Sequence, residues 1–185
     1  MKGVVFTEFI ELVEGRFSIP LAEQMLETTE LPSGGVYTAV GTYDSAEMVA
    51  LVNRLSALTG VPVPDLLMAF GQHLFGRFTE WFPAFFEGIR SAPDFLVRVD
   101  GFVHVEVRKL YPEAELPVFR CERPTQDRLE MTYRSRRKLP DLAEGLIRAC
   151  YGHFGQPVVV ERRSIPGDPE AVLFVLTTSP GSRDG

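Results

Sequence analysis

The period of the hydrophobic pattern changes along the chain, and this change restricts the possible folds more than any other feature. In the first half, Phe6, Phe9 and Val13 recur at the spacing of an amphipathic helix. In the second half, Leu129 and Met131 alternate with polar residues, as in a half-buried strand. Helices followed by strands predict an α+β fold.

Two further helices are expected in the first half. Asp44 with Glu47 three residues later resembles a capping box, and Gly60 is a plausible stop for that helix. The next helix is expected to open at Asp65 and to end or kink at Pro83.

In the second half, residues 157–163 and 171–177 are β-branched runs joined by the turn-rich segment 164–170. This order predicts an antiparallel hairpin. A helix is expected over 141–154, between the strands. The sequence therefore predicts an N-terminal helical part packed on a C-terminal antiparallel sheet with one inserted helix.

Length and composition predict one domain over residues 1–180 and a disordered tail over 181–185. The net charge of -6 argues against a nucleic-acid partner. Glu8 and Glu11 lie where a signal peptide needs an apolar core, and no apolar run approaches the ~20 residues of a membrane span. We therefore expect a cytoplasmic protein that does not enter the membrane.

The two cysteines and three histidines exclude several kinds of site. Cys121 and Cys150 are far apart, and without a CxxC or CxxCH pair they predict neither a disulfide framework nor covalently attached haem. A redox role for them stays open, although Cys150 on an apolar helix face fits a small core residue. No histidine has a HxxxH or HxH partner, which argues against a multi-histidine metal centre. Haem remains possible, because it needs only one protein ligand.

The segment around His104 has an ambiguous pattern. Val103, Val105 and Val107 alternate strictly, which predicts a strand with His104 on its polar face. Val103, Val107 and Leu110 instead fit one face of a helix. The pattern alone slightly favours the strand.

A second group of residues is Tyr133-x-Ser135-x-Arg137. On a strand, this spacing would place two hydroxyls and a guanidinium on one face. Such a trio can bind a carboxylate, including the propionates of haem. The solvent-exposed face of an antiparallel sheet often has the same composition, so both interpretations stay open.

Together these residues resemble the haem nitric oxide/oxygen-binding (H-NOX) domains, which include the haem domain of soluble guanylate cyclase. Those domains carry the Y-x-S-x-R motif, a single upstream histidine and a proline between them. Tyr133, Ser135, Arg137, His104 and Pro117 stand in that layout here.

The resemblance continues outside the motif, from Met1 to about Thr177. The segments Met1-Lys2-Gly3 and Glu80-Trp81-Phe82-Pro83 are similar to bacterial members. The segment Leu116-Pro117-Val118-Phe119-Arg120-Cys121 is similar to the cyclase domains.

The resemblance implies a non-covalent haem b between the helical part and the sheet. It places His104 on a helix as the proximal iron ligand, contrary to the strand pattern. Tyr133, Ser135 and Arg137 would hold the propionates, and Pro117 would press on the porphyrin and keep it bent. The resemblance also implies apolar cavity walls from seven residues, namely Val5, Phe9, Leu74, Phe78, Phe82, Leu142 and Leu146.

The resemblance also bears on the choice of gas. Oxygen-binding members have a tyrosine nine residues after the motif tyrosine, supported by a tryptophan and an asparagine. Here these positions hold Leu142, Phe9 and Leu74, none of which can donate a hydrogen bond. This departure implies a sensor of nitric oxide, and of carbon monoxide more weakly, that does not bind oxygen.

The implied output is signal transduction rather than catalysis. Without an output domain in 185 residues, we expect a separate partner such as a histidine kinase or a cyclic-di-GMP enzyme. One alternative is a haem-free module of the same fold that binds another hydrophobic carboxylate. A hydrolase is disfavoured, because no G-x-S-x-G motif is present and no cysteine stands near a histidine in sequence.

Overall fold

The computed structural model describes residues 1–112 and 114–178, so the predicted tail over 181–185 lies outside the described residues. The helical part comprises α1 (Gly3–Arg16), α2 (Ile19–Glu27), α3 (Ser45–Thr59) and α4 (Val63–Trp81). The short helices η1 (Pro83–Phe86), α5 (Ala92–Leu96), η2 (Val99–Val103) and α6 (His104–Leu110) follow. The C-terminal part comprises β1 (Val118–Thr125), β2 (Arg128–Arg134), α7 (Pro140–His153), β3 (Val159–Ile165) and β4 (Asp168–Thr177).

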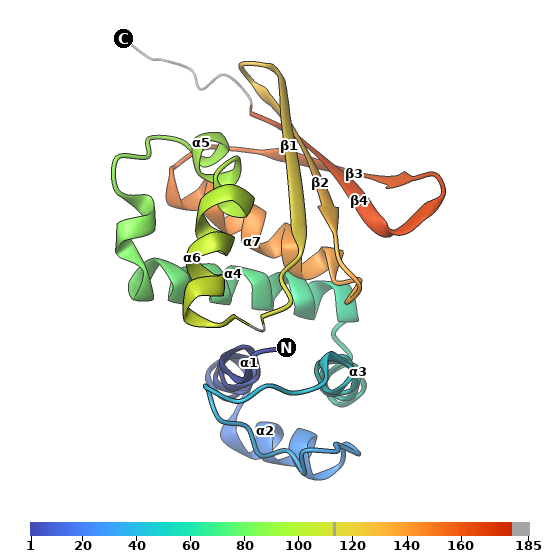
Figure 1. Cartoon of the computed structure of the whole chain (residues 1–185). Helices are drawn as coiled ribbons and strands as arrows, with labels where there is room; N and C mark the ends of the chain where they lie inside the picture. Colours follow the sequence, from blue (N-terminus) through green and yellow to red (C-terminus); the bar gives the residue numbers. More distant parts are fainter. Residues whose placement is uncertain (113, 179–185) are drawn as a thin grey trace.

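The elements form layers around α4. Figure 1 shows α1, α2 and α3 on one side of α4, and α7 and the sheet on the other. The sheet has the order β1-β2-β4-β3, and all its pairs are antiparallel. The predicted α+β architecture is therefore confirmed, including the helix inserted between strands.

The ends of α3 follow from local chemistry. The Asp44 carboxylate accepts a hydrogen bond from the Ala46 N–H (2.9 Å), and Gly60 ends the helix with φ 74°. Glu47 does not complete the expected capping box. It is buried and accepts hydrogen bonds from the hydroxyls of Ser33 and Tyr37 instead. Its carboxylate thus ties the preceding loop to α3.

The predicted hairpin is β3 and β4, and its turn is shorter than expected because both strands extend into the segment 164–170. Strand β2 shows the predicted alternation, with Leu129, Met131 and Tyr133 buried. The sequence prediction did not include α2 or β1.

The slight preference for a strand at residues 102–110 is wrong. The chain there forms a π-helical turn, η2, that runs directly into α6. Val103 and Val107 line a cavity, whereas Val105 is exposed on the opposite side. Val105, which only the strand pattern includes, is therefore not covered, as expected for a helix.

Two hydrophobic cores hold the layers together. One lies among α1 to α4 around Phe6, Phe9 and Phe70, and the other lies between α7 and the sheet around Met131 and Phe174. No helix among the described residues is long and apolar enough to cross a membrane.

Candidate functional site

A cavity of about 570 Å³ lies where the N-terminal helices meet the rest of the chain. Helices α1, α4 and α7 supply one part of its wall, and α6 and β1 with the segment before it supply another. The side chains from α1, α4 and α7 are apolar apart from Trp81 and Cys150. The cavity can therefore hold a large, flat, mainly apolar group.

His104 is the only histidine among the lining residues of the described chain. It is 8% exposed, and burial lowers the pKa of its imidazole. The neutral form that a metal ligand requires is therefore favoured. His73 pairs with Glu8, and His153 packs against phenylalanine rings, both outside the lining.

Asp100 orients the His104 ring. Its Oδ1 lies 3.4 Å from His104 Nδ1, and it also accepts a hydrogen bond from the Phe119 N–H at 3.3 Å. The rings of His104 and Phe119 lie 5.6 Å apart. A proton held on Nδ1 by Asp100 leaves Nε2 as the nitrogen able to bind a metal.

Tyr133, Ser135 and Arg137 all line the cavity, but not as three residues of one strand. Strand β2 ends at Arg134, and the next residues form a turn in which the Arg137 N–H donates to Ser135 Oγ (3.2 Å). The strand geometry that we predicted is thus wrong for Ser135 and Arg137, because the turn and not the pleat brings them to the cavity.

The polar groups of this trio differ in their surroundings. The Tyr133 hydroxyl accepts a hydrogen bond from the Leu139 N–H (3.3 Å), and burial raises the pKa of Tyr133. The half-buried Arg137 guanidinium has no ion-pair partner within residues 1–112 and 114–178. Burial lowers the pKa of Arg137, and nearby Glu115 opposes this effect. A carboxylate from a ligand would satisfy this cation.

The structure brings most of the predicted wall together. Pro117 lines the cavity, as do six of the seven predicted apolar wall residues, namely Val5, Leu74, Phe78, Phe82, Leu142 and Leu146. Phe9 does not line it, and we correct that expectation. Its fully buried ring packs edge-on against Phe70 at 5.1 Å inside the N-terminal core.

Other lining residues were not predicted from the sequence. They include Phe75, Trp81, Phe85, Val103 and Tyr111. Only the number of aromatic residues hinted at such a wall, because aromatics fill any large core.

The cysteines are free thiols. Cys150 is buried, as expected of a small core residue, and it also lines the cavity. Cys121 Sγ lies 3.8 Å from the Leu96 carbonyl. Burial raises the pKa of both thiols, that of Cys121 to about 11, so neither is a reactive thiolate at neutral pH.

These residues fit a haem group. The apolar wall suits the porphyrin, the buried neutral imidazole of His104 suits the iron, and the Arg137 guanidinium suits a propionate. No group of three or more histidine, cysteine or acidic residues among the described ones could hold a bare metal ion. A single-histidine site therefore agrees with haem better than with a bare metal.

The fold and the cavity together define a domain suited to binding haem. A family model described as Haem-NO-binding matches residues 2–162. The chain therefore belongs to this family, the H-NOX proteins, whose members are haem-based gas sensors. No curated protein matches the chain.

Solved H-NOX structures share the fold over nearly their whole length. The Fe(II) unliganded A71G mutant from K. algicida is 36% identical with a TM-score of 0.92, and the match covers 98% of each chain. The Fe(II)CO protein from Shewanella woodyi, solved with bound IWP-051, is 38% identical with a TM-score of 0.83, covering 100% of this chain and 98% of that one. The S. oneidensis protein in the Fe(II)NO state, at 23% identity and a TM-score of 0.87, covers 97% and 99% and supports the fold alone.

Proposed function

We propose that the protein senses nitric oxide at a haem b ligated by His104, binds carbon monoxide more weakly and does not hold oxygen. The observation that carries the proposal is the apolar wall from α1, α4 and α7, in which Leu74 and Leu142 stand where oxygen-binding members have donors. Bound oxygen draws electron density and gains from a hydrogen-bond donor, whereas nitric oxide does not require one. An unmade hydrogen bond of this kind forgoes about 1–3 kcal/mol.

Each site residue has a proposed role. His104 would hold the iron, Tyr133, Ser135 and Arg137 would hold the propionates, and Pro117 would pack against the porphyrin. Haem, when bound, would supply a ferrous iron as the binding site for nitric oxide. Asp100 keeps the His104 ring oriented, and it links α6 to β1 through the Phe119 N–H. A change at His104 would therefore reach both elements.

The output that we propose is binding rather than catalysis. A separate cytoplasmic signalling protein, such as a histidine kinase or a cyclic-di-GMP enzyme, would read the state of α6. The π-helical turn before α6 supports this, because π-helical turns are rare and occur frequently at functional sites. A ligand can shift the population of two states only through different affinities for them.

The absorption spectrum tests the proposal. The purified protein should show a Soret band, the reduced protein should change its spectrum with nitric oxide, and it should show no stable oxygen-bound form in air. Leu142→Tyr should restore part of the oxygen binding if the phenol fits the wall. A stable oxygen-bound spectrum in the wild type would contradict nitric-oxide selectivity but leave the haem site intact. A protein that never takes up haem would favour a module for another hydrophobic carboxylate.

A further inference from the structure

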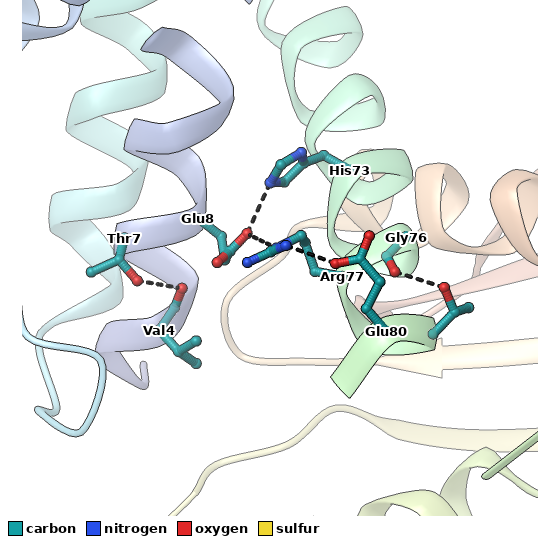
Figure 2. A network of polar contacts seen from close by, with 8 residues as sticks. Val4, Thr7, Glu8, His73, Gly76, Arg77 and Glu80 are labelled. Atoms are coloured by element: carbon teal, nitrogen blue, oxygen red, sulfur yellow. Dashed lines mark hydrogen bonds and ion pairs between the residues drawn. The ribbon is translucent and has the colours of Figure 1, made fainter. Parts of the chain in front are cut away.

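An ionic cluster around one buried carboxylate joins α1 to α4 beside the cavity. The Glu8 side chain on α1 is 6% exposed, and its Oε2 accepts from His73 Nε2 and Arg77 Nε on α4, both at 2.9 Å. Figure 2 shows the two α4 side chains converging on this carboxylate, with Arg77 also reaching Glu80. A buried carboxylate is stable only when it is paired in this way.

Among the described residues, this cluster is the one polar side-chain connection between α1 to α3 and the chain from α4 onward. Between residues 1–59 and 63–178, leaving out 113, no other side-chain hydrogen bond or ion pair links them. The Lys2 ammonium adds only a contact of 5.0 Å with the Tyr111 ring. Apolar packing supplies the remaining contacts of α1 with α4.

The cluster is in direct contact with the cavity wall. Val4 and Val5, one turn before Glu8 on α1, line the cavity. On α4, Arg77 lies between the lining residues Leu74 and Phe78 in sequence. The Arg77 guanidinium also lies 5.0 Å from the ring of Trp81, which is itself a lining residue. Glu8 therefore orients Arg77, and the Arg77 guanidinium packs over the Trp81 ring.

We propose that Glu8 and Arg77 are positioning residues that close the cavity between α1 and α4 and so set the rate at which a gas enters and leaves. This inference rests on the proposed haem site. Loss of Arg77 leaves the buried Glu8 carboxylate with His73 as its one remaining partner, and loss of Glu8 frees the partly exposed Arg77 guanidinium; either change loosens the contact between the helices at this point. It also releases the Trp81 ring, so a small apolar gas passes more easily.

A closure of this kind has a specific kinetic signature. A change in the closure alters one barrier, which a gas crosses both on entering and on leaving the cavity. The association and dissociation rates therefore change by the same factor. The equilibrium affinity then stays constant. An altered bond to iron, or an altered contact with bound gas, would change the affinity instead.

Carbon monoxide binding to the haem-loaded, reduced protein separates these cases. Association is measured by flash photolysis and dissociation by replacement with nitric oxide, in wild type, Glu8→Gln and Arg77→Met. Both rates should rise by about tenfold, equivalent to about 1.4 kcal/mol of barrier, with the dissociation constant unchanged. Glu80→Gln is the matched control, because it removes only the exposed partner of Arg77 and should keep wild-type rates.

Several outcomes would overturn the inference. Wild-type rates in the haem-loaded variants would exclude a role in access, and a changed dissociation constant would assign the cluster to the gas-binding surroundings. Loss of haem from both variants but not from Glu80→Gln would make the cluster a support for haem retention. A wild-type protein that takes up no haem would instead overturn the proposed function.

Discussion

Arg137 lies at the cavity as a half-buried cation without an ion-pair partner among the described residues. Burial of an unpaired guanidinium costs free energy, so its placement indicates a ligand that carries negative charge. Ser135 is different, because its Oγ already accepts from the Arg137 N–H. The two residues should therefore contribute unequally to ligand retention.

Arg137→Ala should weaken haem retention more than Ser135→Ala does. A hydrogen bond to a charged group contributes about 1.5–3 kcal/mol, so haem should leave roughly tenfold to a hundredfold faster. The rate of haem transfer to excess apomyoglobin measures this. The control is Arg136→Ala, which removes the exposed neighbour of Arg137. Equal transfer rates in wild type and Arg137→Ala would show that the guanidinium does not hold a propionate.

At the scale of the element, the sequence predicted secondary structure best where one face of an element is buried and the other is exposed to solvent. Strand β2 is of this kind, and its alternating burial matches its sequence. The prediction for the segment of α6 was wrong because Val105 is exposed, with 39% of its surface accessible. One exposed valine between Val103 and Val107 imitates the alternation of a strand.

The motif residues Tyr133, Ser135 and Arg137 also show what sequence spacing can and cannot predict. Their spacing predicted a shared target, and all three line one cavity. It could not predict the turn that places them there, because that turn depends on tertiary contacts. The Ser135 N–H donates to the Glu170 carbonyl, and Lys138 adopts a left-handed φ of 50°. Neither feature has a sequence signal, since lysine rarely adopts that conformation.

Helices α4 and α7 approach closely through two glycines, and this leads to a prediction about stability. A Cβ at Gly71 would collide with the Leu142 carbonyl, and one at Gly145 with that of Met68. Gly71→Ala or Gly145→Ala should therefore lower the free energy of unfolding by about 1–3 kcal/mol, as overpacking does. Because Leu142 lines the cavity, the same variants should also perturb the haem spectrum.

The controls come from the same two helices. A Cβ at Gly76 on α4 or Gly152 on α7 would meet nothing within 4 Å. Alanine there should raise the free energy of unfolding by about 0.5–1 kcal/mol, because glycine loses more entropy in a helix. Urea denaturation measures all four variants. If Gly71→Ala were as stable as Gly76→Ala, the close approach of the helices would not be required.

At the scale of the whole molecule, the cavity separates two regions that each have a core of their own. One core belongs to the N-terminal helices and the other to α7 and the sheet. Helix α4 contributes to both, through Phe70 to the first and Phe75 to the second. A ligand in the cavity would touch both regions at once, so its binding should stabilise the whole fold.

Haem should therefore raise the temperature of unfolding, and His104 should be required for the full effect. At free haem about 1,000 times its dissociation constant, a ligand that binds only the native state adds about 4.1 kcal/mol. For a chain of this size that shifts the midpoint by roughly 8–16 °C. His104→Gly should lose most of the shift and regain part of it with imidazole, which replaces the missing ligand.

His153→Ala is the control and should keep the full shift in the unfolding midpoint, because that ring lies outside the cavity lining. Calorimetry with and without haem measures the midpoints, and a full shift in His104→Gly without imidazole would show that the iron is not bound through His104.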